Sequence, residues 1–168
     1  MSTAVNRRML KEYLAIQKNS ATRPHLERLE PLQENDLLHW QAVLIGTSDS
    51  AYEGGKFQLD IVIPSSYPIQ PPVIHFTTKI CHPNVHFKTG EICLDILKSE
   101  WTPSWNLESV CVAISSLLTN PEPSSPLNCD AGKSANLLRC GDMAGYNSLV
   151  KMYTELYAMD DDDDNDDK

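Results

Sequence analysis

The sequence predicts one α+β domain, because strand-like and helix-like patterns occupy different parts of the chain. Between residues 25 and 77 apolar side chains alternate at a spacing of two, which is typical of strands with one buried face. Before residue 19 and after residue 106 they recur three and four positions apart, as on helices. A chain of 168 residues, 41% of them hydrophobic, is long enough for one full core. One helix, then strands, then helices is an α+β order.

The first half of the chain is predicted to form a helix and an antiparallel meander. The helix is expected over residues 3–18, with an apolar face made by Val5, Met9, Tyr13 and Ile16. Its basic residues lie on other faces, which indicates either an ordinary solvated surface or a docking face. Short turns between successive strands favour antiparallel pairing. The four expected strands are His25–Leu32, Leu37–Ile45, Lys56–Ile63 and Val73–Thr77.

The second half is predicted to be helical. Asn106 is a plausible N-cap for a buried helix whose apolar stripe is Leu107, Val110, Cys111, Ile114, Leu117 and Leu118. Three prolines end that helix in a loop over residues 120–130. Two further helices are expected, at Ala131–Leu138 and Asp142–Ala158; the second carries Tyr146, Leu149, Val150, Tyr153 and Tyr157 at helical spacing.

The net charge of −9 is concentrated at the C-terminus. Residues 160–168 hold seven Asp and one Lys, so the other 13 basic and 16 acidic residues leave the domain at −3. Such a tail buries no apolar surface and is expected to be disordered. The folded domain is therefore assigned to residues 1–159, and residues 160–168 to the tail. The charge also argues against nucleic acid as a partner.

Five cysteines without a C-x-x-C pair indicate free thiols in a reducing compartment. The sequence has no signal peptide and no apolar run of about 20 residues. Any membrane association is therefore expected to need a partner protein.

The stretch from Cys81 to Trp105 carries the candidate chemistry. Cys93 has three readings: a buried apolar cysteine, a metal ligand, or a nucleophile. The spacing Cys-His-x3-His-x6-Cys fits no usual zinc pattern, so neither a metal nor a cofactor is expected. A nucleophilic thiol near the amide of Asn84 has the minimum equipment for acyl transfer through a thioester. Sequence alone leaves His75 or His82 open as a base.

Another candidate is the proline-rich loop before the last strand. Prolines at 68, 71 and 72 fix an extended loop that offers few backbone donors. Ile69 is an apolar residue in a loop expected to face solvent, and so a candidate recognition residue.

Four linked motifs resemble those of the ubiquitin-conjugating enzymes. They are Tyr67-Pro68-x-x-Pro71-Pro72, His82-Pro83-Asn84, Gly90-x-Ile92-Cys93-Leu94-Asp95-Ile96-Leu97 and Trp101-Thr102-Pro103, in an order and at distances that agree along residues 3–158. The resemblance implies that family's fold: an N-terminal helix, a four-stranded antiparallel sheet and C-terminal helices.

The resemblance also implies roles for individual residues and partners. Cys93 would carry ubiquitin as a thioester, Asn84 would stabilise the oxyanion or its loop, and His82 would be structural. The first helix and two loops would dock the ubiquitin-activating enzyme and RING-type ligases. The docking candidates are Arg7, Ile69, Lys98, Pro103 and Trp105.

Two departures point to a branch of the family. Asn84 and Cys93 are one residue further apart than in most members, so a longer turn is expected over residues 86–89. The acidic residue that many members place near the thiol is replaced by Ser125, with Asp130 a weaker substitute. These features and the segment Leu138–Met143 resemble the peroxisomal branch. That branch works on the cytosolic face of the peroxisomal membrane, held there by an anchor protein, and acts with peroxisomal ligases in recycling import receptors.

Two alternatives stay open. One is a general cytosolic conjugating enzyme with lysine acceptors. The other is a catalytically dead ubiquitin-binding variant, which the intact context of Cys93 disfavours.

Overall fold

The computed structural model describes residues 4–19, 23, 25–121 and 132–159. Helix α1 (Ala4–Lys18) precedes four strands, β1 (Leu26–Gln33), β2 (Asp36–Ile45), β3 (Lys56–Val62) and β4 (Val73–Phe76). A short 3-10 turn, η1 (Asp95–Leu97), and helices α2 (Leu107–Thr119), α3 (Gly132–Arg139) and α4 (Met143–Tyr157) follow. The predicted α+β order is confirmed, and the expected boundaries differ from these by at most one residue.

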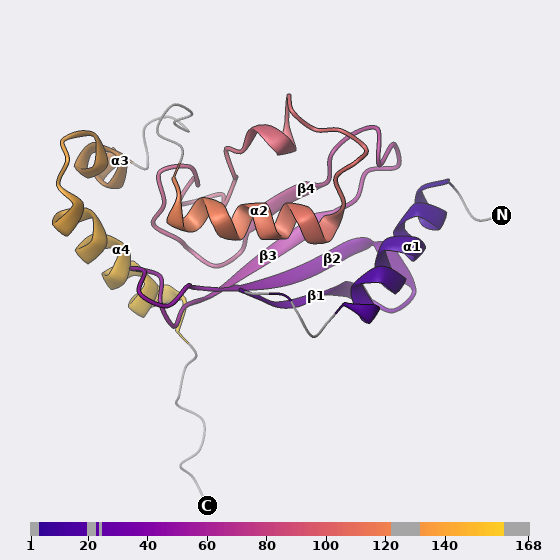
Figure 1. Cartoon of the computed structure of the whole chain (residues 1–168), viewed down its shortest axis with the longest axis horizontal. Coiled ribbons are helices and arrows are strands. Elements are labelled where there is room, and N and C mark those ends of the chain that lie inside the picture. The colour runs from indigo at the N-terminus through magenta and orange to yellow at the C-terminus, as the bar shows by residue number, and fades with distance from the viewer. Residues whose placement is uncertain (1–3, 20–22, 24, 122–131, 160–168) are drawn as a thin grey trace, which may run out of the picture.

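The sheet is a meander in which each strand pairs antiparallel with the next, in the order β1-β2-β3-β4. Its buried face is built from side chains that sit opposite one another across β2 and β3: Trp40 and Ile61, Ala42 and Leu59, Leu44 and Phe57. Helix α2 lies across this sheet and contacts β1 and β2, while α1 and the α3–α4 pair lie at opposite ends (Figure 1).

Helix α2 begins where its sequence predicts. The Asn106 side chain accepts a hydrogen bond from the Ser109 backbone N–H, and the Ser109 hydroxyl accepts one from the Asn106 N–H. This reciprocal capping box satisfies donors that a helix start otherwise leaves free. The predicted N-cap is therefore confirmed, and it sets where the preceding loop must join the helix.

The buried faces of α1 and α4 differ from those the sequence predicts. In α1 the fully buried positions include Glu12, and Tyr13 is only half-buried, with its ring edge-on to Trp40. In α4 the buried residues are Tyr146, Val150 and Thr154. Tyr153 and Tyr157, expected on the apolar stripe, lie outside the buried core: Tyr153 is half-buried and Tyr157 is 43% exposed.

Among the described residues, no helix is both long enough and apolar enough to cross a bilayer. The predicted acidic tail, residues 160–168, lies outside the described residues.

Candidate active site

Cys93 follows directly on a short hairpin that spans residues 85–92. Val85 pairs with Ile92, and the His86 N–H donates to the Glu91 carbonyl at 2.9 Å. The turn at residues 87–89 is closed by the Gly90 N–H, which donates to the His86 carbonyl at 2.8 Å. The longer turn expected over residues 86–89 is thus part of a hydrogen-bonded hairpin.

Gly90 fixes this hairpin to the sheet. The Phe76 N–H at the end of β4 donates to the Gly90 carbonyl at 2.9 Å, and Gly90 has φ = +70°. A Cβ at this position would lie 1.9 Å from the Phe76 carbonyl oxygen. Both the left-handed backbone and the close approach therefore require glycine.

Asn84 and Cys93 are joined across the hairpin. The Cys93 N–H donates to the Asn84 carbonyl at 2.8 Å. Asn84 is fully buried and Cys93 is half-buried, so the thiol lies at the border between the core and solvent. The turn at 87–89 thus leaves the Asn84 backbone hydrogen-bonded to that of Cys93.

His82 is buried, and both of its ring nitrogens are engaged by backbone groups. Nδ1 lies 3.0 Å from the Asn84 N–H, which donates to it, so Nε2 carries the proton and donates to the Leu117 carbonyl at 2.9 Å. Burial lowers the pKa of His82 from 6.5 to about 4. The neutral ring ties the turn holding Asn84 to the end of α2, and it has no nitrogen left for the Cys93 thiol.

The other described cysteines lie in different surroundings. Cys111 is fully buried in α2, where burial raises the pKa of its thiol to about 12. Cys81 is half-buried, and burial raises its pKa as well. Cys140 is exposed and its Sγ is 3.3 Å from the Leu137 carbonyl. In the part of the chain that the structure describes, no three His, Cys, Asp or Glu side chains are grouped to hold a metal ion.

Helix α1 and two loops meet at one end of the molecule. The Arg8 guanidinium donates to the Trp105 carbonyl at 2.8 Å and to the Pro103 carbonyl at 3.3 Å. The indole N–H of Trp101 donates to the Pro68 carbonyl at 2.9 Å. We call the surface formed here by α1 and loops 67–72 and 101–105 the loop end.

The predicted docking residues occupy this end and its neighbourhood. Ile69 is 79% exposed, Arg7 and Pro103 are exposed, and Trp105 is half-buried. Lys98 is exposed, beyond η1, with its Nζ 3.5 Å from a carboxylate oxygen of Glu91. Ser125 and Asp130 lie outside the described residues.

A family profile described as "Ubiquitin-conjugating enzyme" matches residues 8–154, which include every element from the middle of α1 to most of α4. The chain is a ubiquitin-conjugating enzyme.

The relatives of this conjugating enzyme include proteins named for a peroxin. It is 52% identical over 152 residues to "Protein PEROXIN-4" of Arabidopsis thaliana, an alignment that covers 90% of this chain and 94% of the relative. It is 54% identical over 151 residues to "Ubiquitin-conjugating enzyme E2 pex4" of Dictyostelium discoideum, covering 90% and 97%. The H. polymorpha enzyme Pex4p, crystallised in complex with the soluble domain of Pex22p, matches with a TM-score of 0.85 and 39% identity. That match covers 94% of this chain and all of the other.

Sequence patterns missed one buried carboxylate of the conjugating enzyme. Glu12 accepts hydrogen bonds from Arg8 Nε at 2.6 Å, from the Tyr67 hydroxyl at 2.7 Å and from the Leu107 N–H at 2.9 Å. Through these donors it joins α1 to the proline-rich loop and to the first turn of α2. The available signal was the position of Glu12, which continues the helical spacing of Val5 and Met9.

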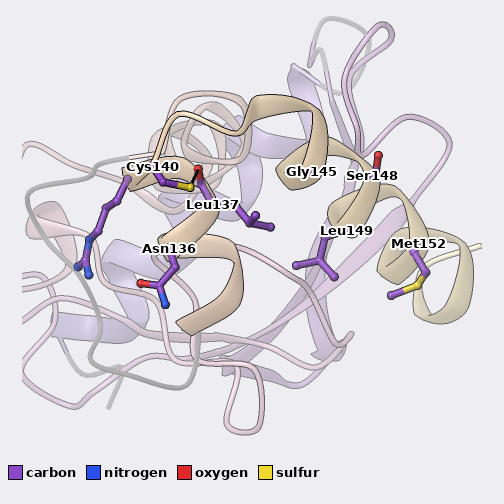
Figure 2. Close-up of a pocket in the computed structure, with 8 residues that line it drawn as sticks. Asn136, Leu137, Cys140, Gly145, Ser148, Leu149 and Met152 are labelled. Atoms are coloured by element: carbon purple, nitrogen blue, oxygen red, sulfur yellow. Dashed lines mark hydrogen bonds between the residues drawn. The ribbon is translucent and has the colours of Figure 1, made fainter.

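The conjugating enzyme also has an apolar groove between α3 and α4, with a volume of about 890 Å³. Figure 2 shows Leu137 on α3 pointing toward Leu149 on α4, with Met152 beyond it and Cys140 above. None of the residues that line the groove belongs to the stretch 81–105.

Proposed function

We propose that this enzyme accepts ubiquitin as a thioester on Cys93 and passes it on with a RING-type ligase. The proposal is carried by the hairpin geometry: Cys93 is half-buried, and its backbone N–H donates to the carbonyl of the buried Asn84. Of the other described cysteines, Cys111 lies inside the core, Cys81 has a raised pKa, and Cys140 lies on the distant groove.

The chemistry is an exchange of one thioester for another. The Cys93 thiolate attacks the thioester carbonyl that joins the C-terminus of ubiquitin to the activating enzyme, a new C–S bond forms, and the activating enzyme's thiolate leaves. In discharge, an acceptor nucleophile attacks the same carbonyl, the C–S bond to Cys93 breaks, and Cys93 leaves as thiolate. Both steps pass through a tetrahedral oxyanion, and the Asn84 amide is proposed to donate to the one that forms in discharge.

The test is charging by the activating enzyme with ATP, followed by non-reducing gel analysis. Wild type should form an adduct that thiol reductants cleave, Cys93→Ser an adduct that resists them, and Cys93→Ala none. Cys140→Ala is the matched control, because it removes an exposed thiol without touching the hairpin. A reducible adduct on Cys93→Ala, through Cys81 for example, would overturn the assignment.

Partner docking is proposed at the loop end. Arg7 on α1 and the exposed Ile69 and Pro103 present charge and apolar surface there, while Trp105 holds the loop through its carbonyl. We assign this surface to the activating enzyme and to RING-type ligases, and Lys98 to contacts near the thiol. Arg7→Ala should weaken charging, measured as a higher KM for the conjugating enzyme, with the melting temperature unchanged.

A peroxisomal role is proposed from the relatives. The H. polymorpha relative is crystallised in complex with the soluble domain of Pex22p, and the Arabidopsis relative is named as a peroxin. We infer that a membrane anchor protein holds this enzyme at the cytosolic face of the peroxisome, where ligases direct it to an import receptor. Tagged enzyme should lose its peroxisomal location when the anchor protein is deleted. If the tagged enzyme is cytosolic both in cells that have the anchor protein and in cells that lack it, a general conjugating enzyme is favoured.

A thiol acceptor is proposed for discharge. A lysine amine has a pKa of about 10.4 and a cysteine thiol about 8.5, so lysine needs more help to lose its proton. Ser125 offers no carboxylate for that help, although Asp130 is near in sequence. Charged enzyme should therefore discharge faster to free cysteine than to free lysine, beyond their difference in solution reactivity. Ser125→Asp should raise lysine discharge selectively. Equal lysine rates in both proteins would remove the physical basis for the preference.

A further inference from the structure

The segment that contains Asn84 is held at two places. At its start, His82 is bonded through Nε2 to the Leu117 carbonyl at the end of α2. After Asn84 the chain runs through Val85 and His86 into the turn at 87–89. The first residue of that turn is Phe87, and its contacts form the second attachment.

Phe87 packs on two tyrosines of α4. Its ring centroid lies 5.3 Å from that of Tyr153 with the planes at 87°, and 6.1 Å from that of Tyr157 at 70°. These are edge-to-face arrangements, which aromatic pairs favour. The ammonium of Lys79 lies 5.3 Å from the Tyr157 centroid and 5.8 Å from the Phe87 centroid, so it faces both rings. We call these four residues the aromatic bracket.

The aromatic bracket accounts for the position of two tyrosines on α4. Tyr153 and Tyr157 are two of the three predicted stripe residues that α4 leaves out of the buried core, Leu149 being the third, and Thr154 is buried instead. Both rings pack on Phe87, the first residue of the turn at 87–89. The ladder from this turn to the thiol is continuous, through the pairs His86–Glu91 and Val85–Ile92 and the bond from Cys93 to Asn84.

We propose that Phe87 is a positioning residue for thioester discharge. It acts through Asn84, by fixing the hairpin of residues 85–92 against α4. The inference rests on the proposed role of Cys93. With the bracket intact, the segment 82–87 is anchored on α2 at one end and on α4 at the other, and Asn84 lies between. Without it, the turn is free to shift and the Asn84 amide loses its fixed position relative to the oxyanion.

The test separates charging from discharge in the full-length enzyme. Thioester is formed with ubiquitin, charging is stopped, and single-turnover discharge to free cysteine is followed at fixed pH. Phe87→Ala and Tyr153→Ala should charge at the wild-type rate and discharge about 3- to 10-fold more slowly, less than the ~10²-fold that a 1 Å misplacement can cost. Phe87→Tyr keeps the aromatic ring and should therefore discharge at the wild-type rate. Lys88→Ala is the matched control on the same turn, where the side chain is exposed.

A double-mutant cycle distinguishes positioning from a general loss of stability. If Phe87 acts through Asn84, then Phe87→Ala should slow wild type but not the Asn84→Ala enzyme, because the donor is already gone. Equal slowing in both backgrounds, or no slowing in wild type, would overturn the inference. Should Phe87→Ala fail to fold, Phe87→Leu is measured against the same criteria. A wild-type enzyme that forms no adduct on Cys93 would instead refute the proposed function itself.

Discussion

The buried His82 predicts a specific loss of stability in acid. Its pKa is lowered by burial from 6.5 to about 4, so between these values the unfolded chain binds a proton that the folded protein does not. Stability from this group is therefore complete above pH 6.5 and is lost as the pH falls toward 4. A difference of about 2.5 units at 1.36 kcal/mol each gives about 3 kcal/mol in total, of which about 2 kcal/mol is lost between pH 7 and pH 5.

The comparison is between wild type and His82→Gln. A glutamine amide can still donate to the Leu117 carbonyl, but it does not titrate. The variant should be less stable at pH 7, by about 1–3 kcal/mol, because the Asn84 N–H loses its acceptor. That deficit should shrink by about 2 kcal/mol at pH 5. At this pH the unfolded wild-type chain gains a proton on His82 that the folded protein does not bind, and the variant has no such group.

The assay is urea unfolding at pH 7, 6 and 5, with the free energy of unfolding extrapolated to water. His39→Gln removes an exposed histidine on β2 and controls for losing one imidazole from the chain. If wild type and His82→Gln lose stability in parallel across this range, His82 is not held neutral by burial. A loss of charging by His82→Gln at pH 7, out of proportion to its folded fraction, would indicate a catalytic role.

Three further predictions concern the site and its surroundings. Asn84→Ala should charge normally but discharge more slowly, toward the lower end of the ~10²–10³-fold typical for losing one oxyanion donor; unchanged single-turnover rates would mean that the amide does not reach the oxyanion. Ile69→Ala should change unfolding by no more than about 0.5 kcal/mol, because the side chain is 79% exposed, and should weaken ligase-stimulated discharge; a large drop in melting temperature would contradict this. Gly90→Ala should destabilise the protein by about 2 kcal/mol or more, because the new Cβ meets the Phe76 carbonyl at 1.9 Å with φ at +70°; wild-type stability in thermal unfolding would show that the hairpin can shift.

The fold was predictable because its signals are local. Alternation over Lys56–Val62 places Phe57, Leu59 and Ile61 on the buried face, and burial follows the pattern residue by residue. The N-cap at Asn106 was equally predictable, since its partner, Ser109, is three residues away. In both cases the spacing along the chain fixes which face a side chain occupies.

The sequence named candidate members of the site but not the contacts that connect them. The sequence places Asn84 and Cys93 in two neighbouring motifs, yet it left open where the turn between them would place Asn84. That depended on the hairpin pairing and on Gly90 approaching β4. The role of Glu12 was equally hidden, because two of its three donors come from Tyr67 and Leu107, which are 55 and 95 residues away.

By itself, then, the sequence determined the α+β order and the strand faces, because each depends on neighbours within a few residues. Its four linked motifs made Cys93 the candidate nucleophile. Only the tertiary structure decided that His82 is held neutral between two backbone groups, that Glu12 joins α1 to two other segments, and that Phe87 faces the tyrosines of α4. These depend on how elements far apart in the chain pack together. A side chain's pKa and its partners are set by that packing, and the spacing of residues along the chain does not contain it.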